Sequence, residues 1–234
     1  MCGRYTNTRG PEEIERQFGL RVPGSEGTHR YNIAPTEEVL AIVSRRGERE
    51  MREMRWGLVP QWSRERKGNA YKMINVRVEG APRNPTYGRL LARADRRALQ
   101  LADGWYEWLK PEKPREPRQP FRFQVDGGAL FAFAAIWTPT KLPDDQWLSS
   151  VALLTCDAGP NRAAASIHGR MPVVLADREV QEAWLDPGVG SEEALSLCGA
   201  LPEARTSVLP ANPAVNSVEA PEGPELLVAP APAG

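Results

Sequence analysis

Turn-forming residues recur along the whole chain and keep every helix and strand short. The 234 residues include 22 prolines and 20 glycines, which interrupt regular structure. This pattern favours a fold rich in β-strands over a helical bundle. No apolar segment approaches the roughly 20 residues that a membrane helix requires. With 41% hydrophobic and 26% charged residues, the composition is that of a globular protein. It excludes a membrane protein, a collagen, a coiled coil and a fully disordered chain.

Residues 71–79 show the clearest strand pattern, because apolar and polar side chains alternate along them. One face of this strand would hold Ile74, Val76 and Val78, and the other Asn75, Arg77 and Glu79. The pattern also predicts strands at residues 39–44, 50–56, 101–109 and 151–155, and a hairpin joining 121–125 to 130–136.

Helices are predicted at residues 11–18, 87–98, 178–185 and 191–198. Asp177 and Ser191 are the expected capping residues of the last two helices. No linker divides the chain, so the sequence predicts a single α+β domain built on an antiparallel sheet. This domain would span residues 2–228, and a disordered tail rich in proline and alanine would follow at residues 229–234.

The net charge of zero hides an uneven distribution of charge along the chain. Residues 1–120 carry 24 Lys and Arg against 16 Asp and Glu, and residues 121–234 carry 6 against 14. Such asymmetry is compatible with a basic face that binds nucleic acid. Alternatively, the opposite charges pair across the fold. Arginine supplies 25 of the 30 cations, and its guanidinium binds phosphate in a bidentate manner.

Cysteines and histidines are too few and too scattered for a conventional metal centre. The chain has Cys2, Cys156 and Cys198, with no C-x-x-C pair, and its histidines are His29 and His168. This pattern predicts neither a disulfide framework nor a zinc site. Free thiols are typical of a reducing compartment, and the start of the chain lacks the apolar segment of a secretory signal.

Cys2 is the first candidate for chemistry. The small residues that follow Met1 favour its removal, which would place an α-amine and a thiol on one residue. Their reference pKa values, about 7.7–8.0 and about 8.5, leave a useful fraction of each nucleophile near pH 7. A 1,2-aminothiol condenses with an aldehyde through a Schiff base and then closes to a thiazolidine. The alternative is a residue without function in a frayed terminus.

Glu107 and His168 are candidates for proton transfer. Glu107 shares a predicted strand face with Trp105 and Leu109, and apolar surroundings raise the pKa of a carboxyl group. His168 precedes an apolar segment and sits beside an arginine, and histidine ordinarily titrates near neutrality. A surface glutamate and a hydrogen-bonded structural histidine are the alternatives.

Polar and aromatic side chains could bind a ligand near these groups. Asn75 and Arg77 would present an amide and a guanidinium from one strand face, unless that face is only solvated. Trp62, near basic residues, could stack on an unpaired base, although core packing is the usual role of a tryptophan.

Six segments of this sequence occur in a fixed order. They are MCGRY at residue 1, YNIAP at 31, WGLVPQW at 56, MINVRVE at 73, ADGWYEW at 102 and IHGRMP at 167. Together they resemble the SRAP (SOS-response-associated peptidase) family of abasic-site processing proteins, from Cys2 to about Leu227. The resemblance implies a single domain that is mainly an antiparallel β-sheet or pseudo-barrel with flanking helices.

The resemblance also implies a function, which is covalent capture of abasic sites in single-stranded DNA without a cofactor or metal. Cys2 would be the nucleophile after loss of Met1. Glu107 would be the acid, and it could also serve a β-elimination (lyase) branch. His168 would shuttle protons and favour formation and reversal of the Schiff base, and Asn75 would bind near the amine and sugar. The other implied DNA contacts are Arg4, Arg77 and Arg170 to phosphates, Trp62 and Pro35 to bases, and Thr155 to the sugar.

Two alternatives to covalent capture stay open. The first is a peptidase with Cys2 as its nucleophile, limited to cleavage of its own Met1 bond. The second is a non-catalytic reader of single-stranded DNA that uses the arginines and tryptophans. The resemblance further suggests a monomer without membrane contact, located in the cytoplasm and associated with the nucleoid if the source is bacterial.

Overall fold

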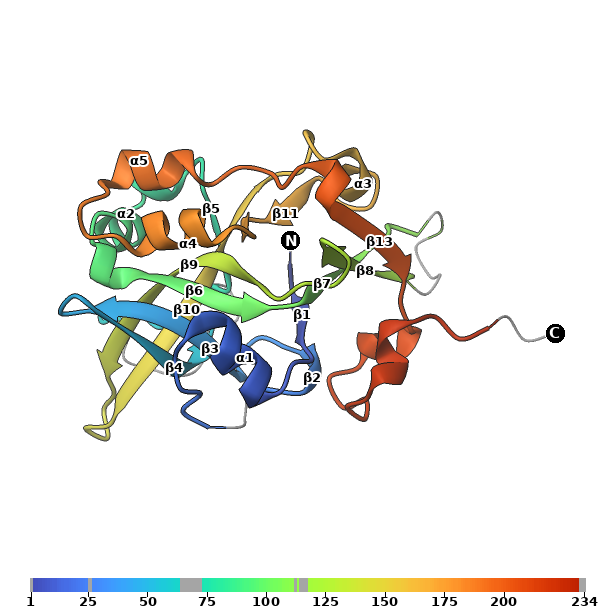
Figure 1. The fold of residues 1–234 in the computed structure, drawn as a ribbon, viewed down its shortest axis with the longest axis horizontal. Helices are drawn as coiled ribbons and strands as arrows, with labels where there is room; N and C mark the ends of the chain where they lie inside the picture. The colour runs from blue at the N-terminus through green and yellow to red at the C-terminus, as the bar shows by residue number, and fades with distance from the viewer. Residues whose placement is uncertain (1, 25–26, 64–72, 112, 114–117, 232–234) are drawn as a thin grey trace.

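The computed structural model describes residues 2–24, 27–63, 73–111, 113 and 118–231. These residues form the predicted α+β domain, with the helices around the outside of the strands (Figure 1). The strands are β1 (Arg4–Asn7), β2 (Arg30–Ile33), β3 (Glu38–Arg45), β4 (Glu48–Trp56), β5 (Asn75–Arg77), β6 (Arg97–Ala102), β7 (Gly104–Trp108), β8 (Pro120–Val125), β9 (Phe131–Lys141), β10 (Trp147–Asp157), β11 (Arg170–Pro172), β12 (Val174–Leu175) and β13 (Thr206–Pro210). The α-helices are α1 (Pro11–Phe18), α2 (Pro85–Leu91), α3 (Arg162–Ala165), α4 (Arg178–Leu185) and α5 (Ser191–Ser196). Short 3-10 helices are η2 (Ala81–Arg83), η3 (Ala94–Arg96), η4 (Glu203–Arg205), η5 (Pro213–Asn216) and η6 (Pro224–Leu227).

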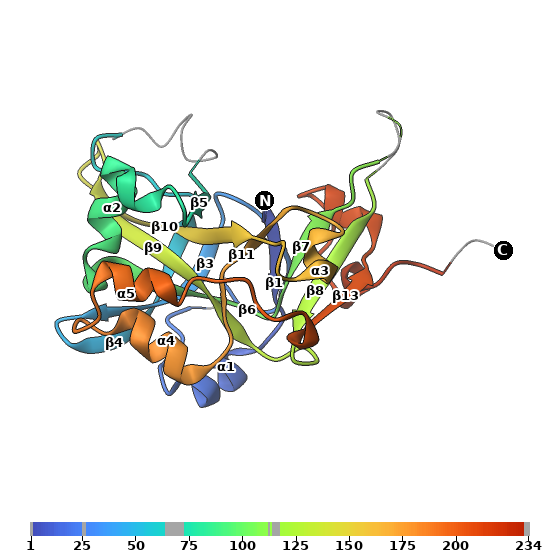
Figure 2. The same ribbon diagram turned by 90° about the horizontal axis from the view of Figure 1, so that it is seen from above.

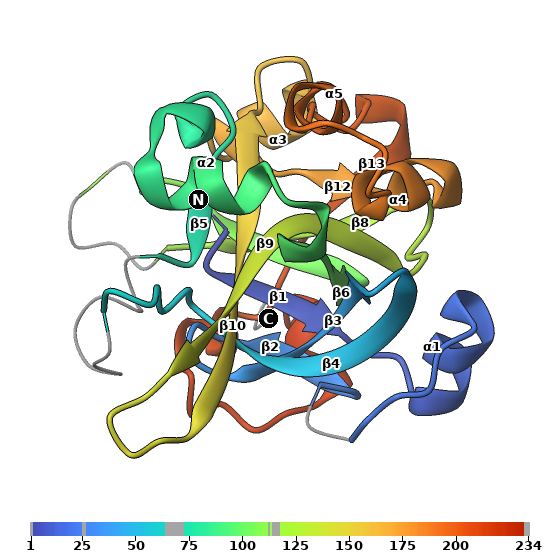
Figure 3. The same cartoon turned by 90° about the vertical axis from the view of Figure 1, so that its left-hand side faces the viewer.

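Five strands close into a barrel in the order β10-β4-β3-β6-β9, because β9 pairs again with β10. The neighbours are antiparallel except for β4 and β10, which run parallel and pair at Ser150–Arg55 and Val151–Trp56. Closure of a sheet removes its exposed edges. The predicted pseudo-barrel is therefore confirmed, and one of its ends faces the viewer in Figure 3.

A second, fully antiparallel sheet has the order β13-β8-β7-β1-β2. It lies beside the barrel (Figure 2). Its β1 strand is paired on both sides, by β2 and by β7. Residues 4–7 are therefore built into the interior of this sheet.

Aromatic side chains join the second sheet to the barrel. Trp105 of β7 stacks on Phe123 of β8, with ring centroids 4.9 Å apart. Edge-on contacts continue from Trp105 to Phe131 and Phe133 of β9, and Tyr5 of β1 meets Phe133 at 5.7 Å. All five side chains are fully buried, and burial of an aromatic side chain contributes about 1.5–3 kcal/mol. This cluster fixes β1 and β7 against the barrel.

The single strand predicted at residues 101–109 is wrong, because the chain passes there from the barrel to the second sheet. β6 ends at Ala102 and β7 begins at Gly104. Between them the buried carboxylate of Asp103 accepts hydrogen bonds from the hydroxyl of Thr6 and from the backbone N–H and hydroxyl of Thr8. Cross-strand partners that are distant in sequence create this break, so the local pattern does not reveal it.

The predicted hairpin at residues 121–136 is also wrong. β8 pairs with β7 and β13 in the second sheet, whereas β9 pairs with β6, β10 and β12. The turn between β8 and β9 therefore connects the two sheets and does not pair the strands that it joins.

Two of the predicted helices match the structure, since α1 and α4 have the expected bounds. The helix predicted at 87–98 is shorter and starts earlier, because Asn84 caps α2 by accepting from the backbone N–H groups of Thr86 and Tyr87 at 2.9 and 3.1 Å. Residues 97 and 98 of that prediction belong to β6. The strand predicted at 71–79 is reduced to β5, and residues 71 and 72 lie outside the described residues.

The two predicted capping side chains do not cap their helices. Asp177 occupies the N-cap position of α4, but its carboxylate forms an ion pair with Arg205 at 2.7 Å. Gly190 precedes α5, so Ser191 is its first residue, and the helix ends at Ser196. Of the predicted tail, Ala229 donates a hydrogen bond to Pro210 O at 3.0 Å, and residues 232–234 lie outside the described part.

The described helices are all too short, or too polar, to cross a lipid bilayer. The three cysteines are buried and free. In the described ranges no three His, Cys, Asp or Glu side chains are grouped as metal ligands would be.

Asp103→Asn should destabilise the protein strongly. Besides its bonds to Thr6 and Thr8, this carboxylate lies 3.6 Å from Arg122, whose side chain is 7% exposed. Removal of one partner from a buried ion pair costs about 3–5 kcal/mol, so urea unfolding should show a loss of about 3 kcal/mol. The matched variant Asp145→Asn breaks an exposed pair with Lys141 and should cost less than about 1 kcal/mol. Equal effects of the two variants would contradict this role of Asp103.

Candidate functional site

Cys2 lies two residues before β1 and is fully buried. The pairing of β1 with β7 places Arg4 opposite Tyr106 and Tyr5 opposite Trp105. The backbone carbonyl of Cys2 accepts a hydrogen bond from Asn75 Nδ2 at 2.7 Å. Two strands and one side chain therefore hold the second residue of the chain in a fixed position.

Asn75 begins β5, which runs parallel to β10 with Asn75 opposite Leu153 and Arg77 opposite Thr155. Val76 points into the core with 1% of its surface exposed, so Asn75 and Arg77 share the other face of the strand, as predicted. The Oδ1 atom of Asn75 is buried and has no hydrogen-bond partner in the described residues. It is free to accept a hydrogen bond from a ligand beside Cys2.

Glu107 lies on β7, on the face of the strand that also carries Trp105. Its side chain is 3% exposed, and burial raises its pKa from the usual 4.5 to about 7. Burial, and after it the negative charge of Glu107, raise the pKa of the Cys2 thiol. Glu107 is therefore a buried carboxyl group close to Cys2, and not a surface residue of an edge strand.

His168 follows α3 and precedes β11. Its Nδ1 atom lies 3.0 Å from the backbone nitrogen and 3.1 Å from the backbone oxygen of Arg170, so the tautomer of the neutral ring decides whether Nδ1 accepts from the first or donates to the second. Burial lowers the pKa of His168, and the positive charge at the start of the chain lowers it further. Cys2 and Glu107 interact directly, and His168 neighbours Arg170, whose guanidinium binds Thr155 of β10.

Arg170 is held in place by acceptors on β10 and in the turn after β5. It forms a bidentate ion pair with Glu79 at 2.7 and 3.0 Å, and it donates to the carbonyl oxygen and the hydroxyl of Thr155 at 2.6 and 3.2 Å. Thr155 itself is fully buried. The guanidinium is therefore preorganised next to His168.

The other two candidate arginines differ in their surroundings. Arg4 donates to Asn32 Oδ1 at 2.7 Å and to Val215 O at 2.8 Å, so its guanidinium is fixed from within the protein. Arg77 is exposed on β5. Both lie within two residues of a predicted catalytic group in the sequence.

Trp62 and Pro35 are not joined to this cluster by a hydrogen bond, ion pair or ring contact within the described residues. Trp62 is 67% exposed, and its indole N–H donates to Thr86 Oγ1 at 3.2 Å. Pro35 is half-buried after β2, next to Thr36, which has a positive φ of 81°. Their roles stay predictions.

The sequence analysis gave no role to two side chains that position candidate residues. Glu79 holds Arg170, and its place on the polar face of the predicted strand was the available signal. Asn32 is 3% exposed and links Arg4 to Ser217 O at 2.8 Å. The segment after β13 that supplies Ser217 is far away in sequence, so nothing local revealed this contact.

Comparison with known proteins identifies relatives of this chain. The model of the family described as SOS response associated peptidase (SRAP) matches residues 1–218. The chain is 33% identical over 189 residues to the abasic site processing protein YoqW of Bacillus subtilis, which covers 80% of this chain and 81% of that protein. It is 29% identical over 238 residues to the abasic site processing protein YedK of Escherichia coli, covering 97% and 99%.

A crystal structure of a protein from Bacteroides thetaiotaomicron shares the fold. Its TM-score is 0.85 at 19% identity, and the match covers 98% of this chain and 100% of that one. The profile match over nearly the whole sequence and the identity to YoqW both identify the family. This chain belongs to the SOS response associated peptidase (SRAP) family.

Proposed function

We propose that this protein captures abasic sites in single-stranded DNA by a covalent thiazolidine linkage to Cys2, after loss of Met1. One observation supports the proposal: the residue that would hold both nucleophiles is anchored by Asn75 and lies beside a buried carboxyl group whose pKa is raised to about 7. The similar YoqW and YedK proteins, named abasic site processing proteins, support it.

The reaction condenses an aminothiol with an aldehyde. The Cys2 amine attacks C1′ of the ring-opened sugar, and the resulting carbinolamine loses water to give a Schiff base. The Cys2 sulfur then adds to C1′, and the thiol proton leaves. Two bonds form to C1′, one water is released, and no electron acceptor is needed.

Glu107 suits the acid role in this sequence. With a pKa of about 7, a large fraction of its carboxyl groups is protonated at neutral pH, and a general acid works best when its pKa lies near the working pH. It donates a proton to the oxygen that leaves as water. The carboxylate that remains accepts the proton of the thiol, whose raised pKa keeps it protonated until then. The same group could serve a β-elimination branch.

His168 and Asn75 complete the set. With its proton on Nδ1, where it donates to Arg170 O 3.1 Å away, neutral His168 can accept a proton from the attacking amine at Nε2. Asn75 orients Cys2 through its carbonyl, and its free Oδ1 can accept from the amine or a sugar hydroxyl.

Arg4, Arg77 and Arg170 would bind the phosphates on either side of the lesion. Guanidiniums held in advance lose little entropy on binding phosphate, and Arg4 and Arg170 are held in this way. Thr155 is buried with its hydroxyl bound to Arg170, so we assign its contribution to the orientation of Arg170. Trp62 is exposed enough to stack on a base.

Cys2→Ala should abolish heat-stable capture while it leaves an α-amine at residue 2. Processed protein, with loss of Met1 verified by mass spectrometry, is incubated with single-stranded DNA carrying one abasic site and run on a denaturing gel. The native protein should give a heat-stable band. The variant should form only a Schiff base, which is visible after borohydride reduction and is otherwise lost on heating.

Cys198→Ala, which removes a buried thiol elsewhere in the chain, serves as the control and should keep the band. Undamaged DNA should give none. A heat-stable band with Cys2→Ala would exclude the thiol from the linkage. Absence of the band from the processed native protein would reject capture and favour a peptidase or a reader of single-stranded DNA.

Glu107→Gln should stabilise the protein at alkaline pH. Because the folded pKa of Glu107 is raised, the folded state binds the extra proton between about pH 4.5 and pH 7, and stability falls as pH rises through this range. Relative to the native protein, the variant should gain about 2 kcal/mol in free energy of unfolding between pH 5 and pH 8. Urea unfolding at both pH values measures this gain, and the exposed Glu193→Gln should show none. If the variant and the native protein differ by the same free energy of unfolding at pH 5 and at pH 8, Glu107 ionises normally.

A further inference from the structure

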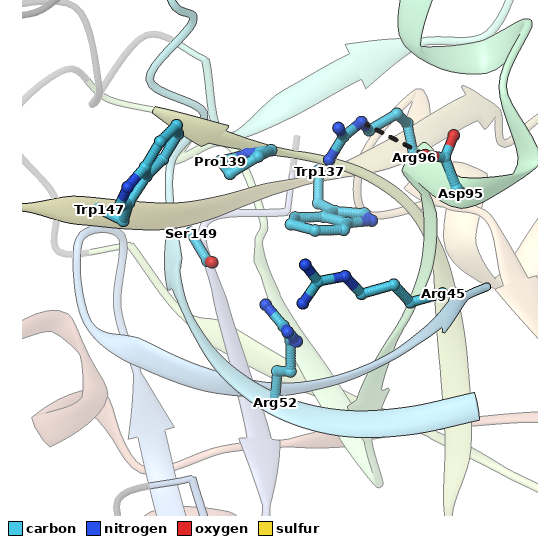
Figure 4. A pocket seen from close by; sticks show the side chains of 8 residues that line it. All are labelled: Arg45, Arg52, Asp95, Arg96, Trp137, Pro139, Trp147 and Ser149. Atoms are coloured by element: carbon cyan, nitrogen blue, oxygen red, sulfur yellow. Dashed lines mark ion pairs between the residues drawn. The ribbon is translucent and has the colours of Figure 1, made fainter. Parts of the chain in front are cut away.

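A cavity of about 360 Å³ lies at the end of the barrel remote from Cys2. β4 and β10 pair at Arg55 and Trp56, and toward the start of β10 they separate and leave an opening. Figure 4 shows this opening, with side chains from β3, β4, β9, β10 and the 3-10 helix η3 around it. The residues on which its chemistry depends are Arg45, Arg52, Arg96, Trp137 and Trp147.

The cavity carries an excess of positive charge. Arg52 is paired with Glu50 at 2.7 Å, and Asp95 is paired with Arg93 at 2.7 Å. Arg45 has no acidic partner in the described residues, and it points toward Arg52 and the Trp137 ring (Figure 4).

Arg96 adds a second cation that is only weakly neutralised, because it lies 4.0 Å from Asp95. Burial lowers the pKa of Arg96, Asp95 raises it in part, and the nearby cations Arg93 and Arg45 lower it again. An anion bound between Arg45 and Arg96 would relieve this repulsion.

Aromatic rings form the floor and the rim of the cavity. Trp137 is 4% exposed, and the guanidiniums of Arg96 and Arg52 lie 4.9 and 5.7 Å from its ring centroid. A guanidinium packed on a ring keeps its in-plane N–H groups available for an oxyanion. Trp147, at the rim, is 66% exposed and offers a free ring face for stacking.

We propose that this cavity binds one nucleotide of the same DNA strand, away from the abasic site. The base stacks on Trp147, and Arg45 and Arg96 bind the adjacent phosphate. This combination of an aromatic platform with cations is how proteins hold single-stranded nucleic acid without sequence preference. The proposal rests on the proposed function, because that function supplies the strand.

The spacing of the two sites fits a short arm of DNA. β10 carries Trp147 near its first end and Thr155, beside Arg170, near its other end. Eight residues at about 3.3 Å each separate them by about 26 Å. A strand stacked as in a duplex advances about 3.4 Å per nucleotide, so about eight nucleotides span this distance, and fewer do so when the strand is extended.

The length of DNA on either side of the abasic site therefore distinguishes binding in this cavity from binding at the reactive site. Capture is measured with abasic oligonucleotides of about 6 and about 24 nucleotides, each with the lesion at its centre so that the short one has no more than about three nucleotides on either side, for Trp147→Ala, Arg45→Ala and the control Arg178→Ala over a range of concentrations. Arg178 is an exposed arginine of α4 that is paired with Glu182. With the long DNA, the concentration for half-maximal capture should rise about tenfold in Trp147→Ala. With the short DNA, the variants should need the same concentration for half-maximal capture as the native protein. At saturating DNA, the rate of capture should also be unchanged.

Salt dependence provides a second readout. Loss of one phosphate contact should reduce the slope of log affinity against log salt concentration by about 0.7 for a single strand. Arg45→Ala should show this reduction with fluorescent undamaged DNA of about 24 nucleotides. Arg178→Ala should leave the slope unchanged.

Native-like behaviour of both cavity variants with long DNA would overturn the proposal while leaving capture at Cys2 intact. Conversely, if no abasic DNA is captured but long undamaged DNA binds more weakly to the variants, the proposed function fails and the cavity assignment stands. The alternative is that the cavity binds an acidic protein segment. A labelled acidic peptide containing one phenylalanine represents such a segment. If Arg45→Ala weakens only the binding of that peptide, the cavity is a protein-binding site and not a nucleotide site.

Discussion

The buried carboxylate of Asp103 determines how the two sheets of this fold meet. It lies at the single residue between barrel strand β6 and sheet strand β7, and it binds Thr6 of β1 and the following Thr8. This contact sets the position of β1 relative to β7. Cys2 is two residues before β1, and Glu107 is four residues after Asp103, so the same contact places Cys2 near Glu107. A carboxylate with several hydrogen bonds and nearby guanidiniums is stable when buried.

Exclusion of water explains the protonation states at the site. Burial raises the pKa values of Cys2 and Glu107 and lowers that of His168, so each group favours its neutral form. A neutral thiol, a carboxylic acid and a neutral imidazole can share a poorly hydrated site without mutual repulsion. In the proposed reaction they would supply, in order, a nucleophile, a proton donor and a proton acceptor. The arginines proposed to bind phosphates include Arg4, which Asn32 holds, and Arg170, which Glu79 holds.

The parts of this structure that depend on neighbours in sequence could be predicted. Alternation along residues 74–79 placed Asn75 and Arg77 on one face, and helices α1 and α4 have the expected bounds. The parts that depend on distant partners could not. The break at Asp103 requires Thr6, the separation of β8 from β9 requires β13 and β6, and the second cavity requires Trp137 to meet Arg45, Arg52 and Arg96. The order of the motifs indicated the family. The contacts between residues of different motifs could be known only from the three-dimensional structure.

Mass spectrometry of the captured product reports directly on the proposed linkage between Cys2 and the abasic site. The adduct between processed protein and an abasic oligonucleotide is measured intact and then digested with trypsin and nuclease. Thiazolidine formation at Cys2 predicts the summed mass of the two partners less one water molecule, with the modification on the peptide that begins at Cys2 and ends at Arg4. It also predicts no free thiol at Cys2 in that peptide. An adduct on a lysine side chain, or a linkage that leaves the Cys2 thiol free to alkylation, would contradict the account.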